Sequence, residues 1–91
     1  MTDANDKQQH FPLGLAHRGF AGVIHRIAAA DAGSALTEVE LESRLLEMGF
    51  VEGAQVEVLH EGAIGRDPIA VRVQNITVAL RRREAMAVIV A

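Results

Sequence analysis

The chain has 91 residues, of which 49% are hydrophobic and 23% are charged, and its net charge is −3 at pH 7. A domain of this length buries only about 60–65% of the surface of its unfolded chain, so its core is small and has no room for a deep active-site cleft. The sequence contains no cysteine, which excludes disulfides, thiolate zinc sites, iron–sulfur ligation and cysteine nucleophiles. The negative charge argues against nucleic-acid binding by bulk charge.

Residues 1–12 have the composition of a flexible polar tail, and the folded domain is expected over residues 13–91. The tail contains Asp3 and Asp6 and has neither an apolar run nor a cleavage site, so it lacks the pattern of a signal peptide. No apolar stretch reaches the roughly 18 residues that a membrane span needs. We therefore expect a cytoplasmic protein that meets a membrane only through a partner.

A first strand is predicted over residues 22–27, followed by a small-residue linker from Ala28 to Ser34. The clearest element is a helix over residues 38–48. Thr37 with Glu40 three residues later forms a capping-box pair, which satisfies two backbone N–H groups at the start of a helix. A single apolar stripe at helical spacing is formed by Leu41, Leu45 and Met48. Gly49 supplies the left-handed residue that ends the helix.

The rest of the chain is predicted to be strand, because apolar and polar residues alternate with a period of two. The predicted strands cover residues 56–59, 69–74, 76–81 and 86–90, with a charged turn at 81–84. About five strands and one inserted helix in so short a chain predict a mainly β protein. Its architecture is expected to be a small closed or nearly closed barrel.

Catalysis has little support in the sequence. Ser34 falls in the linker and Ser43 within the helix, and neither has the context of a nucleophile elbow. Four histidines raise the question of metal binding. The candidates are His17, His25 and His60, with His10 in the tail, and no two have the spacing that places both rings on one ion. We expect no enzyme activity and no required cofactor, with weak binding of Fe(II) or another divalent ion as an alternative.

The charges divide the chain into an acidic and a basic part. The helix holds four glutamates against one arginine, a local charge of −3, and residues 66–83 hold five arginines against one aspartate, a local charge of +4. Such a layout suits docking onto a partner by complementary patches, although solvated faces of small proteins can look the same. The candidate docking residues are Glu38, Glu42, Arg44, Arg82 and Arg83. Nucleic-acid binding at 81–83 is the weaker alternative, because the chain has no Trp or Tyr to stack on bases.

An ordered set of motifs resembles the signature of the FeoA family. The segment from Arg44 to Val58, RLLEMGFVEGAQVEV, is similar to a helix ending in R-L-x-x-[LM]-G-[LF] followed by G-x-x-V-x-V. The similarity continues through residues 65–71, 79–85 and 88–90, and upstream through Leu15, Gly19, Gly22 and Ile24. The sequence departs from the family pattern at Glu52, where Pro is frequent, and at Arg66, which interrupts a G-D-P triplet.

The resemblance implies an SH3-like barrel with one inserted helix. It also implies a small cytosolic accessory protein of bacterial ferrous iron uptake, whose partner is the GTPase-bearing cytosolic region of the transporter FeoB. The alternative is a metal-responsive SH3-like module of the kind found in the carboxy-terminal domains of DtxR-type repressors, since one fold serves several functions. The oligomeric state stays open, with a homo-oligomer among the alternatives.

Overall fold

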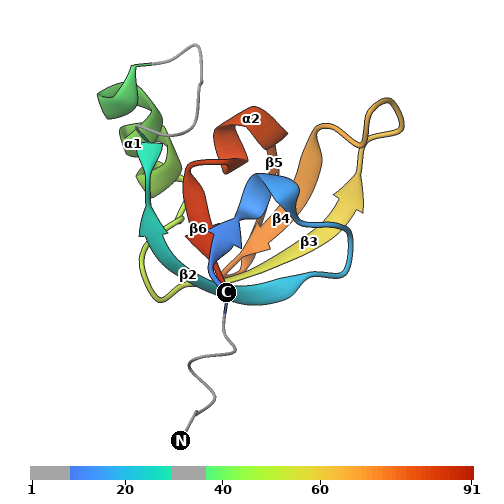
Figure 1. The fold of residues 1–91 in the computed structure, drawn as a ribbon, viewed down its shortest axis with the longest axis horizontal. Helices are drawn as coiled ribbons and strands as arrows, with labels where there is room; N and C mark the ends of the chain where they lie inside the picture. The colour runs from blue at the N-terminus through green and yellow to red at the C-terminus, as the bar shows by residue number, and fades with distance from the viewer. Residues whose placement is uncertain (1–8, 30–36) are drawn as a thin grey trace, which may run out of the picture.

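The computed structural model describes residues 9–29 and 37–91, so the first eight residues of the expected tail and most of the expected linker lie outside the described residues. Six strands form one strongly curved sheet in the order β1-β6-β2-β3-β4-β5 (Figure 1). They are β1 (Phe11–Pro12), β2 (Ala21–Ile27), β3 (Gln55–Glu61), β4 (Ile69–Val73), β5 (Ile76–Leu80) and β6 (Val88–Val90). The mainly β, SH3-like architecture is therefore confirmed.

Strand β2 bends the sheet into a barrel by pairing with two different neighbours. Its first half, Ala21–Val23, lies antiparallel to β3, and its second half, from Ile24 onward, lies antiparallel to β6. The change of partner coincides with an irregularity in register between Ile24 and Arg26. β1 and β5 are left as the two edges, so the barrel is only partly closed.

The inserted helix α1 (Glu38–Glu47) follows the sequence prediction closely. Thr37 Oγ1 accepts a hydrogen bond from the Glu40 backbone N–H, and the Glu40 carboxylate accepts one from the Thr37 N–H, as a capping box requires. Leu41 and Leu45 are buried in the core, and Met48 caps the carboxyl end. Gly49 then adopts a φ of 102°, which a side chain would disfavour.

Three short features differ from the sequence prediction. Residues Arg82–Ala85 form a helix, α2, where a charged turn was expected. This helix delays the last strand, which runs over Val88–Val90 and does not begin at Met86. Phe11 and Pro12, placed in the tail by composition, pair with β6 as β1, and the next residues form a 3-10 helix, η2 (Leu13–Leu15). Each of these elements is too short to give a periodic pattern.

The core lies inside the barrel, and α1, α2 and η2 lie around one end of it (Figure 1). Its largest fully buried side chains are Phe50, Leu13, Ile24, Leu41, Leu45, Ile69 and Leu80. The other two phenylalanines, Phe11 and Phe20, pack against this core and against each other edge to face, with ring centroids 5.2 Å apart. All three phenylalanine rings therefore serve packing.

Candidate docking surface

The side of α1 that points away from the core carries both charge and apolar area. Glu38, Val39, Glu42 and Leu46 are all exposed, with Val39 at 74% and Leu46 at 45%. Val39, Glu42 and Leu46 follow at i, i+3 and i+7, so they form one stripe along the helix. Glu38 lies one turn before Glu42, in the exposed first turn of the helix and beside this stripe on the side of Leu41 and Leu45. We call these four residues the outer face of α1.

Arg44 lies on a different side of the same helix. It follows Glu42 by two residues, which is about 200° around the helix axis. Its Nη1 atom lies 3.3 Å from Glu84 Oε2 of α2, which places α1 beside α2. Because the Arg44 side chain is exposed, this ion pair contributes at most about 1 kcal/mol to stability. Arg44 therefore connects two helices and does not share a face with Glu38 and Glu42.

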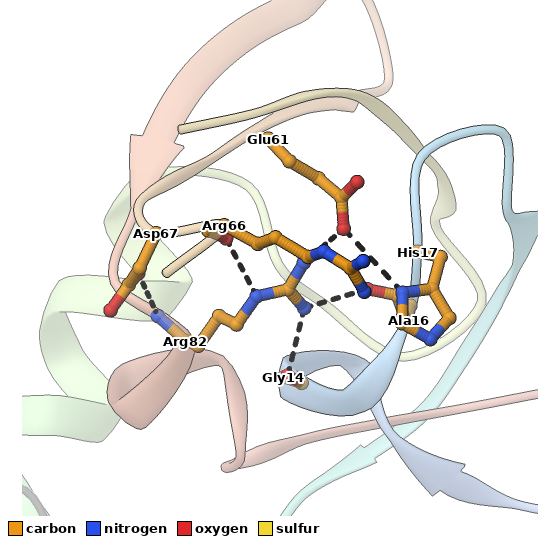
Figure 2. A network of polar contacts seen from close by, with 7 residues as sticks. All are labelled: Gly14, Ala16, His17, Glu61, Arg66, Asp67 and Arg82. Carbon is orange, nitrogen blue, oxygen red and sulfur yellow. Dashed lines mark hydrogen bonds and ion pairs between the residues drawn. The ribbon is translucent and has the colours of Figure 1, made fainter. Parts of the chain in front are cut away.

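Arg82 is the centre of a polar network that connects four segments (Figure 2). Its side chain is only 18% exposed. The guanidinium donates to the carbonyl oxygens of Gly14 and Ala16 at 3.0 and 2.6 Å, to Arg66 O at 2.8 Å, and to the Glu61 carboxylate. We call this network the Arg82 clamp.

The approach of η2 to α2 allows the Arg82 clamp to form. A Cβ on Gly14 would lie 2.4 Å from the carbonyl oxygen of Arg82 and 2.7 Å from the sulfur of Met86. Only glycine fits at this contact. The Arg82 backbone N–H also donates to Asp67 Oδ1 at 2.9 Å, so the start of α2 is fixed to the loop between β3 and β4.

The five predicted docking residues thus fall into two groups. Glu38, Glu42 and Arg83 have exposed side chains for which the described part of the chain provides no ion pair or side-chain hydrogen bond. Arg44 and Arg82 are engaged within the molecule. Sequence reasoning missed this difference, because the three consecutive arginines look equivalent until α2 directs Arg82 inward.

The histidines were candidates for metal binding, and among the described residues the structure does not gather them with other ligating residues into a metal site of three or more. His17 Nδ1 lies 3.5 Å from Glu61 Oε2, but the same oxygen accepts from Arg82 (Figure 2). A cation bound to this oxygen would therefore lie beside the positively charged guanidinium of Arg82 and be repelled by it. His60 is exposed on β3. Within residues 9–29 and 37–91, no group of three or more His, Cys, Asp or Glu could hold a metal ion.

His25 lies against His10, a contact that the sequence did not indicate. Their ring centroids are 3.7 Å apart, with an angle of 32° between the ring planes. His10 was assigned to the tail, and only the pairing of β1 with β6 brings it back to β2. Imidazole nitrogens are common zinc ligands, but these two rings lie against each other at a stacking distance and would have to turn to bring a nitrogen of each onto one ion.

Glu40, in the first turn of α1, has a lowered pKa. The Thr37 backbone N–H and hydroxyl both donate to Glu40 Oε1, at 3.1 and 3.0 Å. These hydrogen bonds, chiefly the one from the backbone, lower the pKa of Glu40 below its ordinary value. Negative charge at the amino end of a helix is also favoured by the helix dipole.

A partly open six-stranded barrel, with a helix inserted between β2 and β3 and exposed on one side, defines a small SH3-like domain. Among the described residues, no helix is long and apolar enough to cross a membrane. The FeoA domain family model matches residues 11–91, and the chain belongs to the FeoA family.

Solved structures agree with this assignment. FeoA of Stenotrophomonas maltophilia complexed with zinc, described as a prokaryotic SH3 domain protein, is 30% identical, covers 89% of each chain and has a TM-score of 0.71. FeoA of Chlorobium tepidum is 28% identical over 88% of this chain and 68% of that one, with a TM-score of 0.70. T. acidophilum IdeR, at 17% identity over 92% of this chain and 34% of its own, shares the fold alone, with a TM-score of 0.68. No curated protein sequence matches the chain.

Proposed function

We propose that this protein is a non-enzymatic accessory factor of ferrous iron uptake that docks on the cytosolic GTPase region of FeoB through the outer face of α1. Membership of the FeoA family supports the role in ferrous iron transport. The observation that carries the docking proposal is the stripe of Val39, Glu42 and Leu46 on a helix whose opposite side is anchored in the core.

The outer face of α1 has the composition of a helix that binds in a groove. Single exposed apolar residues are common on protein surfaces and need no explanation. Here two of them lie on the same stripe of one helix, with carboxylates beside them, which is the pattern of helix-in-groove recognition. The matching partner surface is an apolar groove with basic side chains at its rim.

The helix is already ordered before a partner binds. Its amino end is fixed by the capping box, its buried side by Leu41 and Leu45, and its flank by the Arg44–Glu84 ion pair. Docking therefore costs little additional conformational entropy. Binding would favour one conformation or nucleotide state of the transporter according to its relative affinity for each.

Charge reversal on the outer face of α1 tests this proposal. The double variant Glu38→Lys/Glu42→Lys should weaken binding to full-length FeoB in nanodiscs by about tenfold or more, since it opposes the basic rim and removes both carboxylates. The matched control is Glu47→Lys/Glu52→Lys, which makes the same change in net charge at exposed positions that are not part of the Val39–Glu42–Leu46 stripe. Equal loss in the two variants would mean that net charge, and not this face, governs binding.

A second candidate function is metal binding, favoured by the His10–His25 contact. A FeoA relative was solved in complex with zinc, and these two imidazoles offer nitrogen ligands to such an ion. Calorimetric titration of zinc or Fe(II) into the protein tests it, with His25→Gln as the variant and His60→Gln as the control. Metal binding that is lost in His25→Gln and kept in His60→Gln supports a site at His10 and His25. Absence of binding below millimolar metal concentrations contradicts it.

A further inference from the structure

Strand β5 forms one edge of the barrel. It pairs with β4 on one side, and no other described segment is hydrogen-bonded to its opposite side. The register runs from Ile69 opposite Leu80 to Val73 opposite Ile76. A strand edge of this kind offers its backbone groups to another chain.

The register shows which backbone groups point outward. The Gln74 N–H donates to Gln55 O of β3 at 3.1 Å, so the even-numbered residues of β4 direct their backbone groups toward β3 and the odd-numbered ones toward β5. The β5 residues opposite the odd-numbered ones are Ile76, Val78 and Leu80, so the backbone groups of these three residues are hydrogen-bonded to β4. Thr77 and Ala79 therefore direct both their N–H and C=O groups away from β4, toward the open edge of the sheet.

This edge lacks the features by which proteins usually block strand pairing. The sequence Ile76-Thr77-Val78-Ala79-Leu80 contains no charge, proline or glycine. Its apolar side is covered unevenly: Leu80 is buried, Val78 is half-buried and Ile76 is 58% exposed. An uncharged edge with an exposed isoleucine at one end favours addition of a further strand.

We propose that β5 pairs antiparallel with β5 of a second copy of this chain, forming a two-fold symmetric dimer around Val78. In this register, Thr77 of one copy lies opposite Ala79 of the other, and both have their backbone groups directed outward. The two symmetry-related pairs form four backbone hydrogen bonds between the chains. Ile76 lies opposite Leu80 of the second copy, so its exposed side chain gains an apolar neighbour.

The charges at the ends of β5 favour this register and this partner. Arg81 lies opposite Asn75 of the second copy, which keeps the arginines at 81–83 of the two chains at opposite ends of the interface. A shift of the centre to Ala79 would place Arg81 against Thr77, and larger shifts would bring the arginines together, which costs energy by like-charge repulsion. The centre at Val78 is the register that pairs all five uncharged residues with one another.

Sedimentation velocity and amide exchange by NMR test the proposal on the full chain. Over about 10 µM to about 1 mM, a range suited to a small interface, the wild type should shift from monomer to dimer. The Thr77 and Ala79 amides should exchange rapidly at the low end and become protected at the high end. The Ile76 and Val78 amides should be protected throughout, because they bond to β4.

Two substitutions at one position separate pairing from stability. Thr77→Pro removes an outward N–H that β4 does not use and should weaken the dimer by about tenfold or more. Thr77→Val keeps the N–H and should leave dimerisation intact. A monomer at about 1 mM, or protection of Thr77 and Ala79 only when the transporter is added, overturns the proposal. If Thr77→Pro does not fold, concentration-dependent protection in the wild type decides the question.

Discussion

The Arg82 guanidinium connects η2, the end of β3, the β3–β4 loop and α2, segments that are separated by up to 68 residues along the chain. A planar group with five donors suits such a position, because it can reach several carbonyl oxygens and a carboxylate at once. Arg83, the next residue, is exposed and makes no such contacts among the described residues. The two arginines should therefore respond very differently to substitution.

We predict that Arg82→Ala lowers the free energy of unfolding by about 2–4 kcal/mol, since it leaves the Glu61 carboxylate and several carbonyl oxygens without their donor. Arg82→Lys should recover only part of this loss, because an ammonium cannot reproduce the planar geometry. Urea denaturation of the wild type and of each variant measures the free energy of unfolding. Arg83→Ala is the control and should change stability by less than about 0.5 kcal/mol. Equal destabilisation by Arg82→Ala and Arg83→Ala would show that the Arg82 clamp contributes no more to stability than an exposed arginine does.

The titration of Glu40 is predicted to depend on Thr37. Because the pKa of Glu40 is lowered in the folded state, its contribution to stability is present above the pKa of the unfolded chain and is lost as the pH falls through the folded value. In Thr37→Ala the donating hydroxyl is absent while the backbone N–H of residue 37 remains, so the pKa of Glu40 should rise part of the way toward its ordinary value. NMR titration of the Glu40 side chain in the wild type and in Thr37→Ala measures this. An unchanged Glu40 titration in the variant would contradict the hydrogen bond from the Thr37 hydroxyl to the Glu40 carboxylate.

At the scale of the secondary-structure elements, the contact between η2 and α2 depends on Gly14. We predict that Gly14→Ala destabilises the protein by about 1–3 kcal/mol, because the added Cβ meets a backbone oxygen that cannot move independently of α2. Thermal or urea denaturation provides the measurement. Leu15→Ala, at an exposed position of the same turn, is the control and should be nearly neutral. Free tolerance of alanine at position 14 would mean that η2 and α2 can separate without cost.

The sequence predicts α1 and the longer strands well, because each combines several local signals. For α1 these are the Thr37–Glu40 pair, the apolar stripe and Gly49, and the structure contains all of them. The short elements could not be predicted in this way. A four-residue helix and a two-residue strand are too short to show a period, and tertiary contacts determine them.

The candidate site was predicted only in part for the same reason. Exposure of Glu42 follows from the helical period, and exposure of Glu38 follows from its place in the first turn of the helix. The inward direction of Arg82 depends on carbonyl oxygens of η2 that are distant in sequence, and no local pattern contains that information. The His10–His25 contact likewise arises from strand pairing between β1 and β6.

At the scale of the whole molecule, the net charge of −3 conceals an acidic helix and an arginine-rich segment. If these charges guide association, the rate at which the protein binds its partner should fall as ionic strength rises, because salt screens the attraction between complementary patches. Stopped-flow or surface-based kinetics at low and physiological salt measure this. The dissociation rate should change less than the association rate. An association rate that does not depend on salt would show that these charges do not guide binding.

The most direct test of the central claim is the affinity of the purified protein for full-length FeoB in nanodiscs, measured with and without guanine nucleotide. We predict saturable binding at micromolar concentrations that depends on the nucleotide, is weakened about tenfold or more by Glu38→Lys/Glu42→Lys, and is retained by Glu47→Lys/Glu52→Lys. Absence of binding in every nucleotide state, or equal binding by both double variants, would contradict docking through the outer face of α1.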